Sequence, residues 1–67
     1  MTLERLRDWR ATAARAAGIL PDAVCTDRVL AAIAEQRPAS PEELDAISGL
    51  GGLTSRRLYP GIAAALA

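Results

Sequence analysis

The stretch SPEELDAISGLGG, residues 40–52, carries the clearest structural signals in the chain. Ser40 is a good helix cap, Pro41 suits the first helical position, and Glu43 follows at the third, as in a capping box. A helix is therefore expected over residues 41–47, with its apolar positions facing a core.

Downstream of this helix, the glycines of residues 49–52 predict a tight turn. A further helical stretch is expected from about residue 53 or 54 to 58. Pro60 and Gly61 are expected to interrupt it, because proline lacks the N–H that a helix interior needs. A final short helix would then cover residues 62–67.

Upstream, the first helix is expected over residues 2–17, with Thr2 as its cap and Gly18 just past its end. Apolar residues recur there at helical spacing. The buried face is expected to contain Leu3, Leu6, Trp9, Ala13 and either Ala16 or Ala17.

Between the first helix and residue 26 lies a connector, residues 19–25, in which Pro21 forbids a continuous helix. Its apolar anchors are expected to be Ile19, Leu20, Val24 and Cys25.

A second helix is expected to begin at a Thr26 cap and to stop near Gln36, because Pro38 disfavours helical geometry before it. Its buried face would hold Val29, Leu30, Ile33 and Ala34.

Composition agrees with these patterns. The chain has 67 residues, only two aromatic side chains and an excess of alanine, which favours helices that pack closely over sheet. We therefore expect an all-α fold: a single domain built as a compact bundle of four to five short helices, monomeric, and cut from a longer chain. The first residues do not form a secretory signal and no apolar run approaches the ~20 residues of a membrane span, so a cytoplasmic protein is expected.

Eight arginines balance eight acids, so the formal net charge is zero. Nucleic-acid binders usually carry a basic excess, which counts mildly against strong DNA binding. The charge is unevenly spread, because residues 21–48 hold six acids and two arginines, whereas both ends are basic. Histidine is absent and Cys25 is the single cysteine, which excludes zinc sites and nucleophilic triads. No catalytic residue, metal or cofactor is expected.

The order of short motifs along the chain resembles the HRDC domain, the helicase-and-RNase-D C-terminal module. The resemblance covers roughly residues 3–66, and its parts are Leu6-Arg7-x-Trp9-Arg10, the connector 21–25, Thr26-Asp27, Leu30-x-x-Ile33-Ala34, Arg37-Pro38, Ser40-x-x-Glu43-Leu44 and Ile47-x-Gly49-Leu50-Gly51.

The resemblance implies a non-catalytic bundle that helps a RecQ-type helicase or an RNase D enzyme engage its substrate. Members of the family that bind DNA do so weakly, through an aromatic side chain in the connector and basic residues near the glycine turn. This chain differs at both places. Asp22 and Ala23 follow Pro21 in the connector, Thr54 or Ser55 stands where a lysine is usual, and the terminal aromatic–glycine step has an inserted proline.

The glycine turn and the residues after it are the candidate nucleic-acid site. Glycines before a helix let backbone N–H groups approach a phosphate, as in helix-hairpin-helix proteins, although they also simply permit a sharp turn. Two arginines beyond the turn suit phosphate contact, or else form a solvated helix face. The candidate residues are Gly49, Gly51, Gly52, Arg56, Arg57 and Tyr59; the ring of Tyr59 would stack on a base or pack at a hinge.

Acidic residues form a second candidate site, for docking on a basic partner surface: Asp22, Glu42, Glu43 and Asp45. Simple solvation is the alternative. Arg5, Arg7 and Arg15 form either a second basic surface or a solvated helix face, and Arg10 is expected to pair with Asp27 as a structural link.

The expected function is that of an accessory domain of a RecQ-like DNA helicase, active near the nucleoid in repair and recombination. It would dock on the helicase core, contact single-stranded or branched DNA weakly, or do both. The alternative is an interaction module of an RNase D-type nuclease or another nucleic-acid enzyme. Docking ranks slightly above DNA binding, given Asp22, the missing lysine and the zero net charge.

Overall fold

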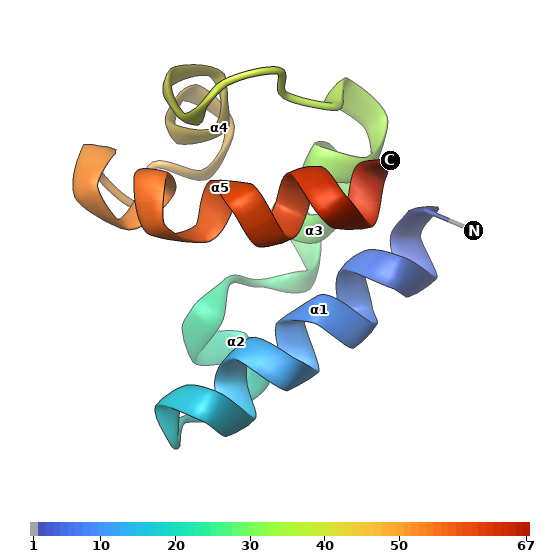
Figure 1. Cartoon of the computed structure of the whole chain (residues 1–67), viewed down its shortest axis with the longest axis vertical. Coiled ribbons are helices and arrows are strands. Elements are labelled where there is room, and N and C mark those ends of the chain that lie inside the picture. The colour runs from blue at the N-terminus through green and yellow to red at the C-terminus, as the bar shows by residue number, and fades with distance from the viewer. Residues whose placement is uncertain (1) are drawn as a thin grey trace.

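Five helices account for most of the chain in a computed structural model that describes residues 2–67 (Figure 1). They are α1 (Thr2–Ala17), α2 (Pro21–Val24), α3 (Asp27–Gln36), α4 (Pro41–Ser48) and α5 (Gly52–Leu66). The described residues contain no strand. The expected all-α bundle is confirmed.

The helix starts follow the capping signals of the sequence. The N–H of Val29 donates to the Thr26 hydroxyl at 3.3 Å, and the N–H of Glu43 donates to the Ser40 hydroxyl at 3.2 Å. Each bond satisfies an amide that a helix start leaves without a partner. Thr2 is an exception, because it lies inside the first turn of α1 rather than at its cap, a difference of one residue at a helix end.

Three helices end on a residue with positive φ. Gly18 and Gly49, at φ 69° and 67°, follow α1 and α4, where a glycine adopts the left-handed conformation without steric cost. Arg37 adopts φ 48° after α3, and its N–H donates to the Ile33 oxygen at 2.8 Å. Each helix thus stops where the sequence indicated.

The connector between α1 and α3 differs from expectation. Pro21 does prevent a continuous helix, but it also starts the one-turn helix α2, because proline suits the first helical position. Val24 and Cys25 are buried as expected, whereas Ile19 and Leu20 are not anchors: their exposed fractions are 45% and 77%. Because α2 is a single turn, its C-terminal end is buried at Val24 and Cys25, and the residues just before the helix stay in solvent.

The expected break at Pro60 and Gly61 is wrong, because α5 runs unbroken through both residues. Proline in a helix interior costs about 3 kcal/mol, so packing on both sides must outweigh it. Ser55 before the proline and Ile62 after it are both fully buried. Gly61 has a separate role: a Cβ placed there would overlap the Trp9 indole nitrogen and lie 2.8 Å from its Cδ1. This glycine lets α5 approach α1.

The core lies between α1, α3, α4 and α5. The buried apolar residues that form it are Leu6, Ala14, Val24, Cys25, Leu30, Ile33, Leu44, Ile62 and Leu66. Trp9, Ala13, Val29, Ala34 and Ile47 pack against it while partly exposed. On α1 the stripe continues through Ala14 and not through Ala16 or Ala17, both of which are exposed, because α1 and α5 diverge toward that end (Figure 1).

Candidate interaction surfaces

The glycine turn between α4 and α5 uses its own amide groups. The N–H of Gly49 donates to the Asp45 backbone oxygen at 2.8 Å, and that of Leu50 donates to the Ser48 hydroxyl at 3.3 Å. The N–H of Gly51 donates to the Asp45 carboxylate, also at 2.8 Å. The amides of Gly49, Leu50 and Gly51 are therefore already bonded here, whereas no side chain caps the start of α5.

Asp45 links α4 to α5. Besides the Gly51 amide, its Oδ1 accepts from the Ser55 hydroxyl at 3.3 Å, and Ser55 is fully buried. The carboxylate thus lies at the N-terminal end of α5, where the helix dipole favours an anion. An internal negative charge occupies the region where the sequence suggested a bound phosphate.

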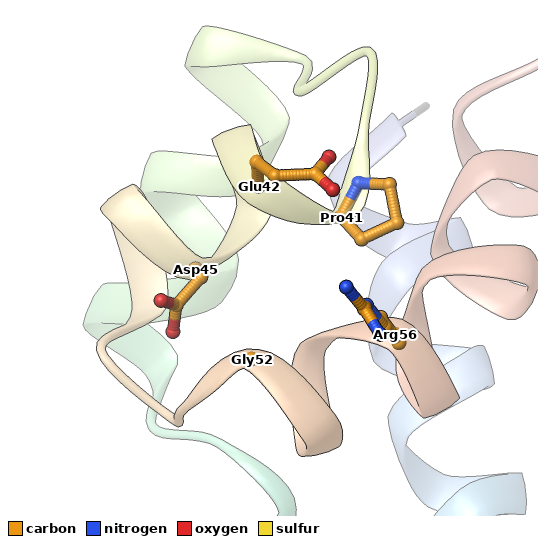
Figure 2. A pocket seen from close by; sticks show the side chains of 5 residues that line it. All are labelled: Pro41, Glu42, Asp45, Gly52 and Arg56. Carbon is orange, nitrogen blue, oxygen red and sulfur yellow. The ribbon is translucent and has the colours of Figure 1, made fainter.

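Arg56 lines a small pocket of about 140 Å³ beside the start of α5 (Figure 2). Pro41, Glu42, Asp45 and Gly52 form the rest of its lining. The Asp45 side chain points away from Arg56 in this view. Within residues 2–67, Arg56 forms no salt bridge with either acid. An anion brought to Arg56 would nevertheless meet the negative charge of Glu42 at the same pocket.

Arg57 faces a different part of the molecule. It lines a groove of about 330 Å³ between the C-terminal half of α1, α2 and the first turns of α5. We call it the α1–α2–α5 groove; its lining includes Ala13, Ala17, Ile19, Ala23, Thr54 and Arg57. The two neighbouring arginines, expected to reach one phosphate, thus open onto separate hollows.

Tyr59 lies one turn beyond Arg56 along α5 and is half-buried against the core. Tyr59 lines a hollow of about 250 Å³ together with Arg37, Pro38 and Leu66. Residues three apart share a helix face, so Tyr59 and Arg56 point to the same side of α5, whereas Arg57 does not. The six candidate nucleic-acid residues therefore do not converge on one point.

The acidic residues are divided as well. Glu42 and Glu43 are exposed in the first turn of α4, whereas Asp22 lies on α2, at the opposite end of the view in Figure 1. The Asp22 Oδ1 lies 3.8 Å from the Arg10 Nη1. The Asp45 carboxylate already accepts a hydrogen bond at the glycine turn. The four do not form one patch.

Arg10 ties three segments together, as the sequence suggested in part. Its Nη2 lies 2.8 Å from the Asp27 carboxylate, which confirms the expected pair. Its Nη1 also donates to the Cys25 backbone oxygen at 3.1 Å. The side chain is only 11% exposed, so this arginine is unavailable to a ligand.

Two further arginines hold the C-terminal end of α5. Arg5 donates from Nη1 to the Ala67 backbone oxygen at 2.6 Å, and Arg37 donates from Nη2 to the Leu66 oxygen. Cations at a helix C-terminus satisfy free carbonyl groups and complement the dipole. Sequence reasoning missed both bonds, because the partners are 62 and 29 residues apart in the chain.

The described residues show little that would support catalysis. Burial raises the pKa of the Cys25 thiol, an effect that the nearby Arg10 opposes and Asp27 reinforces. A buried thiol that keeps its proton is a poor nucleophile. Residues 2–67 hold no group of His, Cys, Asp and Glu side chains able to bind a metal, and no described helix is long and apolar enough to cross a membrane.

Comparison with known proteins gives one match. The family model for the HRDC domain matches residues 1–66, almost the whole chain. No curated protein and no solved structure matches significantly.

Proposed function

The chain belongs to the HRDC domain family of non-catalytic accessory modules of nucleic-acid enzymes, and we propose that it serves a RecQ-like DNA helicase, mainly by docking on protein. In this proposal it is one domain of a larger helicase chain that acts on the chromosome in repair and recombination. It adjusts how the parent engages its substrate.

The observation that carries the ranking of docking over DNA binding is the Asp45 carboxylate at the glycine turn. It accepts from the Gly51 amide at 2.8 Å and from Ser55 at 3.3 Å. A DNA phosphate at this turn would face a like charge and would find the Gly51 amide already bonded. Phosphate neutralisation supplies most non-specific affinity for DNA, so a turn arranged in this way contributes little.

Weak DNA contact remains the lesser part of the proposal. Arg56 and Arg57 are exposed, and Tyr59 is half-exposed on the same side of α5 as Arg56. In this reading Arg56 touches the DNA backbone and Tyr59 supports a base, without help from the glycine amides. Isolated contacts of this kind give low affinity that falls steeply with salt.

A second candidate parent is an RNase D-type nuclease or another nucleic-acid enzyme. Membership of the HRDC family is compatible with both parents. Reading the coding sequence around residues 1–67 distinguishes them, since a helicase parent carries ATPase motifs and a nuclease parent carries clustered metal-binding carboxylates.

The proposed ranking is tested by fluorescence anisotropy with a labelled single strand and a labelled fork, at low and at physiological salt. We expect weak binding that disappears at physiological salt, and a change in helicase activity when the domain is deleted from its parent. Binding that survives physiological salt and is lost on Arg56→Ala would contradict the ranking. An unchanged helicase after deletion would contradict docking.

A further inference from the structure

The exposed apolar side chains of this domain gather at one end. In the described part of the chain the large hydrophobic residues with the greatest exposure are Leu20 at 77%, Leu53 at 69%, Ile19 at 45% and Leu50 at 36%. They come from two segments, the start of the α2 connector and the glycine turn with the first turn of α5. Exposed apolar groups that cluster, unlike scattered ones, mark interaction sites.

These two segments flank the α1–α2–α5 groove. Ile19 itself lines the groove, and Leu20 is the next residue. Leu53 precedes the lining residue Thr54 and lies four positions before Arg57, hence on the same helix face. Ile19 is therefore part of the groove, and Leu53 lies beside it on the face of α5 that carries Arg57.

The shape and charge of the groove define what it can hold. Ala13, Ala17 and Ala23 line one side with small side chains, so a partner backbone can come close. Arg57 is the single charged residue in the lining, and it forms no salt bridge within the described residues. Its charge is open to a carboxylate of an incoming segment.

We propose that the α1–α2–α5 groove is a docking site for an amphipathic helix of a partner protein, with its apolar face in the groove and a carboxylate against Arg57. This inference rests on the proposed docking function and names its surface and the chemistry of the partner. Helices often bind this way, through apolar anchors spaced along one face. Nucleic acid does not fit, because a single arginine among apolar side chains offers phosphates almost nothing.

The matched probe is a pair of synthetic helical peptides with the same leucine stripe, one carrying glutamate beside the stripe and the other lysine. Binding to the 67-residue chain is followed by fluorescence anisotropy. We expect the glutamate peptide to bind at least about tenfold more tightly, as for close charge pairs at interfaces. Arg57→Glu reverses the preference. Arg56→Glu, which changes the next residue but faces another pocket, preserves it.

Leu53→Gln gives an independent readout, because Leu53 is exposed and its replacement leaves the core intact. We expect it to weaken the glutamate peptide about tenfold or more, since a leucine loses its burial against the partner. The helical content, measured by circular dichroism, should not change. A second variant, Leu20→Gln, tests the segment that contains Ile19 and should also weaken binding.

Three outcomes of the peptide titrations would overturn the inference: no binding of either peptide up to ~1 mM, the same charge preference in Arg57→Glu as in the unmodified chain, or full binding in both leucine variants. A dimer in sedimentation that Leu53→Gln abolishes would overturn it too, by assigning the groove to a second copy. The groove and the proposed function fail separately. If the peptides bind with the expected charge preference but deletion of the domain leaves helicase activity unchanged, the proposed function is wrong and the groove assignment stands.

Discussion

The two ends of the α1–α5 pair are built in opposite ways (Figure 1). Toward the start of α1 and the end of α5, Gly61 admits the Trp9 ring, and Arg5 and Arg37 bond to the last backbone oxygens. At the other end the helices diverge, Arg57 has no acidic partner among the described residues, and leucines face solvent. The closed end uses its arginines for its own fold, and we propose that recognition belongs to the open end.

The largest effect is expected at the closed end, from Gly61→Ala. The added Cβ overlaps the Trp9 ring, which must move although it is partly buried. Overpacking of this kind costs about 1–3 kcal/mol. This loss exceeds the stability gained because alanine favours the helix more than glycine does. Thermal unfolding measures the loss, and Trp9 fluorescence reports the shifted ring.

Gly52→Ala is the control on the same helix at the open end. Nothing lies within 4 Å of a Cβ placed there, so stability should hold or rise slightly. Equal losses of stability in Gly61→Ala and Gly52→Ala would contradict the difference between the closed and open ends.

The next effect concerns the link between α1 and the segment that joins α2 to α3. Arg10→Met keeps the aliphatic stem but loses the Asp27 pair and the bond to the Cys25 oxygen. We expect a loss of about 1–2 kcal/mol in urea unfolding, because the acids are largely exposed while the guanidinium is not. Arg7→Met, at an exposed position of the same helix, should change stability by less than about 0.5 kcal/mol. An equal loss there would show that Arg10 is not a special link.

A smaller effect on stability, with a larger one on binding, is expected from Asp45→Asn. Asparagine keeps an oxygen for Gly51 and Ser55 but removes the charge, so the cost should be about 0.5–1 kcal/mol. Single-stranded DNA should then bind a few-fold more tightly, because the like charge at the turn is gone. Glu43→Gln, an exposed acid of the same helix, controls for net charge alone. If both variants gain equally, the position of Asp45 has no particular importance.

Cys25 should give the smallest effect. Burial raises its pKa above the ordinary value of 9.0, so the folded thiol holds its proton more tightly than the unfolded one. Its contribution to stability is complete below pH 9.0 and is lost as the pH rises through the folded pKa. Cys25→Ala should be less stable at neutral pH and should lose less stability in that alkaline range. If stability falls with pH in the same way in both proteins, Cys25 is not the group that titrates in this range.

The sequence predicted what local chemistry determines. The caps at Thr26 and Ser40, the ends at Gly18 and Gly49 and the Arg10–Asp27 pair are all present. These features depend on neighbouring residues or on one recognisable charge pair. They were enough for α1, α3 and α4 and for most of the core, but not for α2 or for the unbroken α5.

What the sequence missed depends on contacts between distant segments. The break expected at Pro60 fails because residues on both sides of it are buried, a tertiary effect that exceeds local propensity. Arg5 and Arg37 bond to oxygens that no local rule connects to them. The division of Arg56 and Arg57 between two hollows follows from how α5 sits on α1 and α4.

The central claim is that recognition belongs to the open end and is directed at protein. The most direct test is amide NMR on the 67-residue chain, titrated in parallel with a single-stranded DNA and with the glutamate peptide. We expect the peptide to shift the amide signals of Ala23, Thr54 and Arg57, and DNA to leave those of Gly49 and Gly51 unmoved. DNA-induced shifts centred on Gly51 and Ser55, with no response to the peptide, would contradict it.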